Sequence, residues 1–185
     1  MPFDASSEAA PAAALFTAAD VAAILRERGW LDASRDIMAG TPLGRWCAHA
    51  AELLAPHAAD RAALVDLLAL VFAYDAQALV RDPANHAVLA RVGVRDVIRE
   101  VANRLLEGGD LDSDRFKEII DGVKTTLPHR GRELFYPIRL ALAGRAGDGE
   151  LDRVILLLDA AAGLDLSVPV KGARQRMLEF CAAFD

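Results

Sequence analysis

Apolar positions recur at intervals of three and four residues along most of the chain, which is the spacing of one face of an α-helix. The pattern is clearest between Val94 and Leu105, where apolar side chains occupy positions i, i+3, i+4, i+7 and i+11. No stretch of five or more residues alternates with period two, and no two-residue hairpin turn joins strand-like runs. The pattern therefore predicts an all-α protein, a helical bundle of about eight or nine helices.

Capping residues and prolines mark the ends of the predicted helices. Thr17 and Asp20 have the spacing of a capping box, which starts a helix that ends at Gly29. Thr41 followed by Pro42 starts the next helix, to about residue 54, because proline at the first helical position loses only an N–H that has no partner there. The other predicted helices open at Asp60, Asp82, Val94 and Ser113, and cover residues 134–143, 151–162 and a last segment that holds Met177 to Phe184.

The chain divides most naturally near Gly108–Asp110, where two glycines and an aspartate separate two helical patterns. This division gives an N-terminal helical half, residues 15–108, and a C-terminal helical half, residues 109–185. One packed unit fits the pattern equally well. Residues 1–14 are small and polar and have no basic residue ahead of an apolar core, so they are predicted to be a disordered tail rather than a secretory signal.

The composition agrees with a water-soluble helical protein. Alanine, the best helix former, is the commonest residue, and only 6% of the residues are aromatic. The longest apolar stretch, Leu64–Tyr74, is interrupted by Asp66 and is too short to span a bilayer. Cys47 and Cys181 lie far apart and have no metal-binding spacing. We therefore expect a cytoplasmic protein with reduced thiols and no membrane partner.

Motifs typical of catalysis or cofactor binding are missing from the sequence. It contains no GxxxxGK[ST], GxGxxG or HExxH motif. The four histidines do not pair at metal-binding spacing on one predicted helix, and no serine or cysteine has a convincing histidine partner. Glu133 and Asp148 flank one predicted helix, but paired carboxylates in an acidic protein are usually solvated. We therefore expect no enzymatic activity, no cofactor and no metal site.

Basic residues concentrate in one part of this acidic chain. The whole chain has a net charge of -6, whereas residues 115–145 hold seven bases and only three acids. A basic island on an acidic body attracts phosphates locally, although cations that stabilise helix ends on an ordinary mixed surface give the same count. The seven bases are Arg115, Lys117, Lys124, Arg130, Arg132, Arg139 and Arg145.

Residues 131–145 read Gly-Arg-Glu-Leu-Phe-Tyr-Pro-Ile-Arg-Leu-Ala-Leu-Ala-Gly-Arg. This segment resembles the signature of the C-terminal anticodon-binding domain of bacterial glutamyl-tRNA synthetases, a helical module with the pattern Gly-Lys-x-Leu-Phe-x-Pro-Leu-Arg-x-Ala-Leu-Thr-Gly. The resemblance extends over about residues 94–162. The ATP-handling signatures of these class I enzymes, His-x-Gly-His and Lys-Met-Ser-Lys-Ser, are absent. The resemblance therefore implies a free-standing, non-catalytic module that binds tRNA or another structured RNA.

The resemblance also implies which side chains would meet RNA. Arg139 is equivalent to an arginine that contacts an anticodon base, and a guanidinium can stack on a base and hydrogen-bond to its edge. Because Ile138 belongs to the expected core stripe, Arg139, one step round a helix whose first turn contains Pro137, is expected to project outward. The positions of Asp148 and Leu151 would border the anticodon. The bases expected to hold the phosphates are Lys117, Lys124, Arg130, Arg132 and Arg145.

Some positions depart from the family pattern. Ala143 replaces a threonine or serine, Gly149 replaces a proline, and Asp148 places a negative charge where phosphates would approach. A second interpretation therefore stays open, in which the scaffold is a protein-interaction or regulatory adaptor that docks through exposed apolar residues on its outer helices. Arg139 also has a structural alternative, an ion pair with Glu133 or Asp148 that holds the turn.

Overall fold

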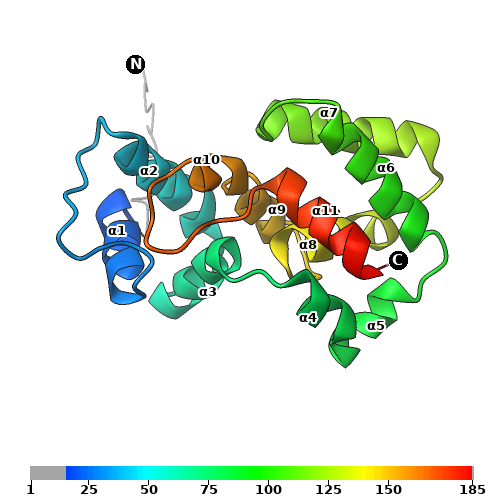
Figure 1. The fold of residues 1–185 in the computed structure, drawn as a ribbon, viewed down its shortest axis with the longest axis horizontal. Coiled ribbons are helices and arrows are strands. Elements are labelled where there is room, and N and C mark those ends of the chain that lie inside the picture. Colours follow the sequence, from blue (N-terminus) through cyan, green and yellow to red (C-terminus); the bar gives the residue numbers. More distant parts are fainter. Residues whose placement is uncertain (1–15, 185) are drawn as a thin grey trace, which may run out of the picture.

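Helices are the only regular secondary structure in residues 16–184, the part of the chain that the computed structural model describes (Figure 1). The predicted all-α fold class is confirmed. The predicted tail, residues 1–14, lies outside the described residues. The elements are α1 (Ala18–Glu27), α2 (Pro42–Leu54), the 3-10 helix η1 (Ala55–His57), α3 (Arg61–Phe72), α4 (Ala76–Arg81), α5 (Pro83–Leu89), α6 (Val94–Leu106), α7 (Ser113–Thr126), α8 (Arg132–Ala143), α9 (Glu150–Ile155), α10 (Leu158–Ala162) and α11 (Ala173–Phe184).

The short helices are where the structure differs from the predicted elements. The helix predicted over residues 151–162 is two helices, α9 and α10. Between them the N–H of Leu157 bonds to the carbonyl of Val154 at 3.1 Å, three residues back rather than four, which tightens the turn. The sequence pattern also missed α4, whose N-cap is Asp75.

Helix caps lie close to their predicted places. In α1 the Thr17 hydroxyl accepts a hydrogen bond from the Asp20 N–H at 3.4 Å, and the Asp20 carboxylate accepts one from the Thr17 N–H at 2.7 Å. Thr41 caps α2 through its hydroxyl at 3.1 Å. At α7 the prediction was one residue off, because Asp112 rather than Ser113 is the N-cap. These side chains fix where the amphipathic segments begin.

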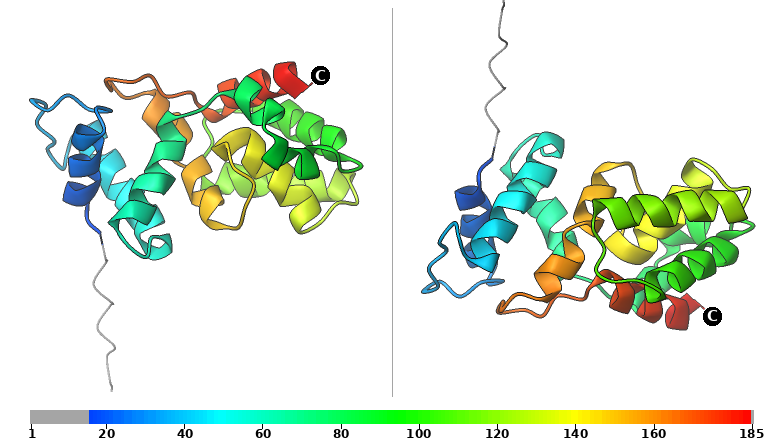
Figure 2. Two further views of the ribbon diagram at one scale, coloured as in Figure 1. Left: turned by 90° about the horizontal axis from the view of Figure 1, so that it is seen from below. Right: turned by 90° about the horizontal axis from the view of Figure 1, so that it is seen from above.

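The molecule is elongated, with α1–α3 at one end and α4–α8 together with α11 at the other (Figures 1 and 2). Helix α9 joins the two ends, because it packs against α2 and α3 as well as α8. Helix α6 packs against α8 and α11, so contacts cross the boundary predicted near Gly108–Asp110. The buried apolar side chains belong to one hydrophobic core cluster that draws on both predicted halves.

Aromatic side chains pack against one another among α1, α2 and α3, and one of them also bonds to a later part of the chain. Trp30 stacks on Phe72 with 4.3 Å between ring centroids, and Trp46 meets the same ring edge-on at 6.3 Å. The indole N–H of Trp46 donates to the carbonyl of Leu157 at 3.2 Å. This bond ties α2 to the break between α9 and α10 and satisfies the one polar atom of a buried indole.

A buried arginine joins the helices around α8. Arg176 of α11 is 0% exposed, and its guanidinium lies 4.6 Å from the ring centroid of Tyr74. The Tyr74 hydroxyl donates to the carbonyl of Ala141 at 2.6 Å. Burial lowers the pKa of Arg176 to about 10 and raises the pKa of Tyr74 above its ordinary value. The guanidinium donates to the main-chain carbonyls of Leu70, Val71, Leu142 and Lys171.

Candidate nucleic-acid interface

Helix α8, which carries most of the family-like segment, is a central helix and not a surface helix. From Pro137 to Ala143 every residue is buried, because α6, α9 and α11 pack around this part of the helix. Pro137 lies in the second turn and not in the first turn, as was predicted, since α8 already begins at Arg132. Only the N-terminal part of α8 therefore presents side chains to a ligand.

Arg139 is buried inside this arrangement. Its residue exposure is 8%, and its Nε and Nη2 atoms each lie 2.7 Å from a carboxylate oxygen of Asp152 on α9. Its Nη1 donates to the carbonyl of Gly147 at 2.8 Å, and its guanidinium lies 4.8 Å from the ring centroid of Phe135. The expectation that Arg139 projects outward is wrong, because α9 folds back over the face of α8 on which it lies.

The predicted partners of Arg139 make other contacts. Glu133 lies 3.7 Å from the Nδ1 atom of His129, and Asp148 accepts a 3.4 Å hydrogen bond from the Tyr136 hydroxyl. Asp148 is exposed beside the α8–α9 turn, whereas Leu151 is 0% exposed and packs in the core. The expectation that Leu151 borders a ligand surface is therefore wrong, because its side chain fills the space between helices.

Three bases of the island, the half-buried Lys124 and the exposed Arg130 and Arg132, lie where α7 ends and α8 begins. Lys124 and Arg132 each lie over an aromatic ring of α8, the first 6.0 Å from Phe135 and the second 5.7 Å from Tyr136. Both rings are half-buried. Lys117 precedes Lys124 by seven residues, so it is exposed on the same face of α7 but two turns further from α8. We call Lys117, Lys124, Arg130, Arg132, Phe135 and Tyr136 the α7–α8 face.

Arg130 holds the connection between the two helices. Its guanidinium donates to the carbonyls of Lys124, Leu127 and His129 at 2.6–2.7 Å, and it remains exposed. A cation at this place stabilises the negative end of the α7 dipole and satisfies carbonyls that the helix leaves unpaired. Arg130 therefore has a structural role that does not depend on any ligand.

Arg145 does not belong to the α7–α8 face. It follows the opposite end of α8 and lines a hollow of about 250 Å³ with residues of η1, α3 and α9. Two acids, Asp66 and Glu150, line the same hollow together with His57. Arg145 is exposed there, but the acids beside it offset its charge.

Residues 115–145 have an excess of positive charge in the sequence, but less of that charge is available at the molecular surface. Arg139 is neutralised by Asp152, and Arg115 lies 2.8 Å from a carboxylate oxygen of Glu118. Lys124 lies 3.2 Å from Asp121. Lys117 and Arg132, by contrast, have no hydrogen bond or ion pair to a charged group within residues 16–184. The charge offered to a ligand is therefore modest and is concentrated on few side chains.

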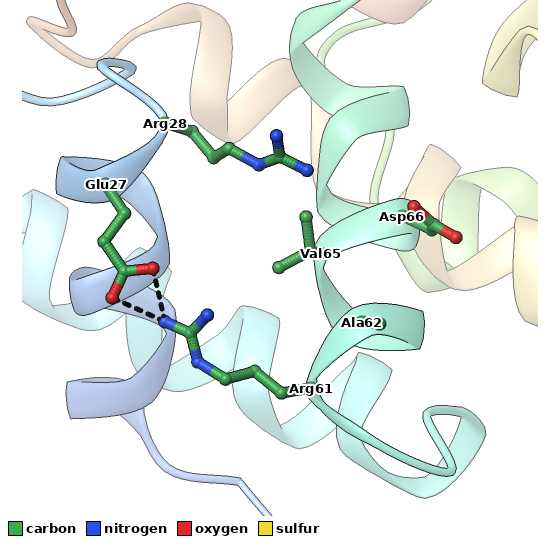
Figure 3. A pocket seen from close by; sticks show the side chains of 6 residues that line it. All are labelled: Glu27, Arg28, Arg61, Ala62, Val65 and Asp66. Carbon is green, nitrogen blue, oxygen red and sulfur yellow. Dashed lines mark hydrogen bonds and ion pairs between the residues drawn. The ribbon is translucent and has the colours of Figure 1, made fainter.

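A larger hollow, of about 460 Å³, lies between the end of α1 and α3 (Figure 3). Arg28 and Arg61 face it from opposite helices, and Asp66 lies at its edge. Glu27 accepts two hydrogen bonds of 2.7 Å from Arg61. Because two bases meet two acids here and no nucleophile lines the space, the hollow presents no set of groups suited to chemistry.

The described part of the chain also lacks the groups that a metal centre or a membrane span needs. Within residues 16–184 no three histidine, cysteine, aspartate or glutamate side chains come close enough to hold a metal ion. No helix in this range combines the length and apolar character that crossing a membrane requires. Cys47 is buried, and burial raises the pKa of its thiol to about 11, which makes it a weak nucleophile.

Sequence reasoning missed the residues that hold the site together. Asp152 is thirteen positions from Arg139, so no helical spacing links them, and only the packing of α9 on α8 brings them together. The same holds for Asp159, whose carboxylate accepts hydrogen bonds from the N–H groups of Leu111 and Ala173 at 2.7 and 2.6 Å.

Part of the chain is similar to bacterial glutamate–tRNA ligases. A stretch of 97 residues, 52% of this chain, is 35% identical to the glutamate–tRNA ligase of Heliobacterium modesticaldum and 33% identical to that of Bacillus licheniformis. A stretch of 72 residues, 39% of this chain, is 31% identical to glutamate–tRNA ligase 2 of Syntrophus aciditrophicus. No protein-family model and no solved structure matches the chain.

The similarity covers less than a fifth of the first two relatives and 15% of the third. The chain is thus similar to a limited part of these ligases, and the predicted resemblance to the synthetases is confirmed at that level.

Proposed function

We propose that this chain is a non-catalytic RNA-binding module, with tRNA as the favoured ligand, and that it binds through the α7–α8 face. The main support is the convergence of cations and aromatic rings on that face, together with the partial similarity to glutamate–tRNA ligases. Aromatic rings stack on unpaired bases, while lysine and arginine neutralise the adjacent phosphates.

Two features of the face suit a phosphate chain. Lys117 and Arg132 are exposed and are not neutralised by a described acid. Tyr136 is half-buried under Arg132, which holds the ring in place as a platform beside these charges.

The proposal differs from the family pattern because Arg139 is not among the side chains proposed to contact RNA. Arg139 and Leu151 are buried and act in folding, and Arg145 lies among acids at the other end of α8. The candidate contacts are therefore Lys117, Lys124 and Arg132, with Arg130 contributing charge while it caps α7. Asp148, exposed beside Tyr136, limits how closely phosphates approach on that side.

The chain is also proposed not to charge tRNA. These 185 residues hold neither of the two ATP-handling signatures of class I synthetases. The proposal is consistent with a fold that, in residues 16–184, has no sheet on which such enzymes bind nucleotides.

Binding to total tRNA at low salt tests the proposal, by gel shift and by fluorescence anisotropy with labelled tRNA. If about three phosphates are neutralised, log affinity should fall with log salt concentration at a slope of about -2 to -3. An excess of single-stranded RNA should compete better than duplex DNA of equal length, because only unpaired bases can stack on the face. Even weak non-specific binding at physiological salt has a Kd on the order of tens of micromolar. If tRNA is not shifted at such protein concentrations at low salt, the proposal is wrong.

A further inference from the structure

An acid lies beside the aromatic ring that the RNA-binding proposal uses as a platform. The Tyr136 hydroxyl donates a 3.4 Å hydrogen bond to a carboxylate oxygen of Asp148. Asp148 is exposed, and within residues 16–184 it has no other hydrogen bond and no ion pair. An ionised carboxylate accepts several hydrogen bonds and donates none. Asp148 therefore keeps the capacity to accept hydrogen bonds from a ligand that lies on Tyr136.

Arg132 and Asp148 flank Tyr136 from opposite directions along α8. Arg132 precedes Tyr136 by one helical turn, and its guanidinium lies 5.7 Å from the ring centroid. Asp148 follows Gly147, whose carbonyl accepts a hydrogen bond from Arg139, so the α8–α9 turn lies over the part of α8 that comes after Tyr136. Arg132 is exposed and has no hydrogen bond or ion pair to a described residue, so it is able to move from the ring face to the edge of a bound group. The ring thus lies between a donor and an acceptor.

An acid at this place is unsuited to a phosphate and suited to the edge of a nucleic-acid base. A carboxylate repels phosphate oxygens, but it accepts hydrogen bonds from the N–H groups on the Watson–Crick edge of an unpaired base. The ammonium group of a protein ligand would also satisfy Asp148, but the cations of the α7–α8 face would repel it. The combination of one acceptor with surrounding cations therefore favours RNA with an unpaired base at Tyr136.

The four RNA bases differ in what they offer to a carboxylate. Guanine has its N1–H and N2 amino donors side by side, which match the two oxygens of one carboxylate. Uracil has one N–H between two carbonyls that a carboxylate repels, and adenine and cytosine each place one amino donor beside a ring nitrogen that is an acceptor. Guanine also carries the N7 and O6 acceptors that an arginine binds through two parallel hydrogen bonds. Guanine is thus the base that satisfies Asp148 and Arg132 together.

We propose that the α7–α8 face selects an unpaired guanine, which stacks on Tyr136, donates from N1–H and N2–H to Asp148, and accepts at N7 and O6 from Arg132. This inference rests on the proposed RNA-binding function and adds the base that the face prefers. It gives Asp148 a role in specificity, while the lysines of the α7–α8 face neutralise the adjacent phosphates.

The test uses the full chain, fluorescein-labelled tRNA at low salt, and short oligouridine RNAs as unlabelled competitors. The competitors differ only at the central position, which is guanosine, adenosine, cytidine or uridine. We expect the guanosine RNA to compete about tenfold better than the other three. Inosine lacks the N2 amino group and 7-deazaguanosine lacks the N7 acceptor, so each of them at the central position should lose most of this advantage.

Asp148→Ala should abolish the preference for guanosine and, because it removes a negative charge, should strengthen the binding of the all-uridine RNA. A merely structural loss would weaken the binding of every RNA. Asp121→Ala is the matched control, because it removes an exposed acid that pairs with Lys124 on the same face. It should strengthen the binding of all four RNAs and keep the preference. Arg132→Gln should no longer distinguish guanosine from 7-deazaguanosine. Circular dichroism establishes that each variant is folded.

The outcomes separate this inference from the RNA-binding proposal. If tRNA binds but all four competitors act equally, or none of them competes, the selection of guanine is wrong and RNA binding stands. A guanosine preference that survives Asp148→Ala, or one that Asp121→Ala removes equally well, would also overturn it. If the labelled tRNA itself does not bind, the RNA-binding proposal fails, and the selection of guanine fails with it.

Discussion

Arg139 of α8 and Asp152 of α9 form a forked ion pair, with two N–O distances of 2.7 Å and side-chain exposures of 10% and 23%. The same guanidinium donates to the carbonyl of Gly147, so it spans the turn that joins the two helices. An arginine in this position is a structural clamp. It fixes how α9 lies against α8 and therefore how α8 is held in the core.

Removing the acid of this clamp should destabilise the fold strongly. Asp152→Asn leaves a buried guanidinium without its counter-charge, and the expected loss is about 3 kcal/mol or more in the free energy of unfolding. Urea denaturation followed by circular dichroism measures it. Asp121→Asn, which breaks the exposed pair with Lys124, is the control and should cost less than about 0.5 kcal/mol. Equal losses in both variants would mean that the pair is not a clamp.

Arg176 should be the least replaceable charged residue of the described core. Arg176→Met keeps an apolar stem of similar length but leaves four main-chain carbonyls without a donor, so we expect a loss of about 4 kcal/mol or more. Arg176→Lys should recover only part of the lost stability, because one ammonium group cannot donate to all four carbonyls as the planar guanidinium does. Arg28→Met, on an exposed side chain, should have almost no effect on the midpoint of thermal unfolding. A loss of the same small size at position 176 would contradict the assignment.

The capping box of α1 should give stability that depends on pH. Hydrogen bonds from Thr17 lower the pKa of Asp20, so the stabilising carboxylate is fully formed above its ordinary pKa of 3.8 and is lost as the pH falls through the lower folded value. Thr17→Ala should cost about 1 kcal/mol at pH 7. The difference from the unaltered chain should shrink below pH 3, because protonated Asp20 no longer favours the box. Urea midpoints at pH 7, 4 and 2.5 measure this, and a constant difference would refute it.

Charge reversal should map the RNA-binding face. Arg132→Glu and Lys117→Glu should each weaken tRNA binding and reduce the salt slope by about 1. Tyr136→Ala should cost about 1–3 kcal/mol of binding if the ring stacks on a base. Arg28→Glu is the control and should leave the slope unchanged, because Arg28 follows α1, which lies at the other end of the molecule from α7 (Figure 1). Fluorescence anisotropy titrations at several salt concentrations measure the tRNA affinity of each variant and the slope of log affinity against log salt concentration.

Much of the helical framework could be predicted because its signals are local. A threonine followed by proline at 41–42, and an aspartate at 60, set the starts of α2 and α3 through side-chain caps that depend only on neighbouring residues. The end of α8 at Gly144 follows from its φ of +80°, a conformation that glycine adopts without strain. These features involve a handful of consecutive residues, so the sequence pattern predicts them without knowledge of the tertiary fold.

The candidate site was less predictable because it depends on contacts between distant segments. Periodicity placed Arg139 beside a core stripe, but a helix covered on several sides buries the flanking positions as well. The position of Lys124 over Phe135 depends on the turn at Arg130, which brings the end of α7 against the start of α8, whereas Arg132 and Tyr136 are four residues apart on α8 itself. A pattern within one helix does not contain that information.

The bonding of Arg176 also constrains the order in which the protein can acquire its structure during synthesis. The carbonyls of Leu70, Val71 and Leu142 are all synthesised, and leave the ribosome, before Arg176 does. Until that guanidinium emerges, the ends of α3 and α8 lack their shared donor, and the region around α8 has no α11 to cover it. Nascent chains halted before residue 176 should therefore remain open to proteases and chaperones, and the final compaction should coincide with the arrival of one side chain.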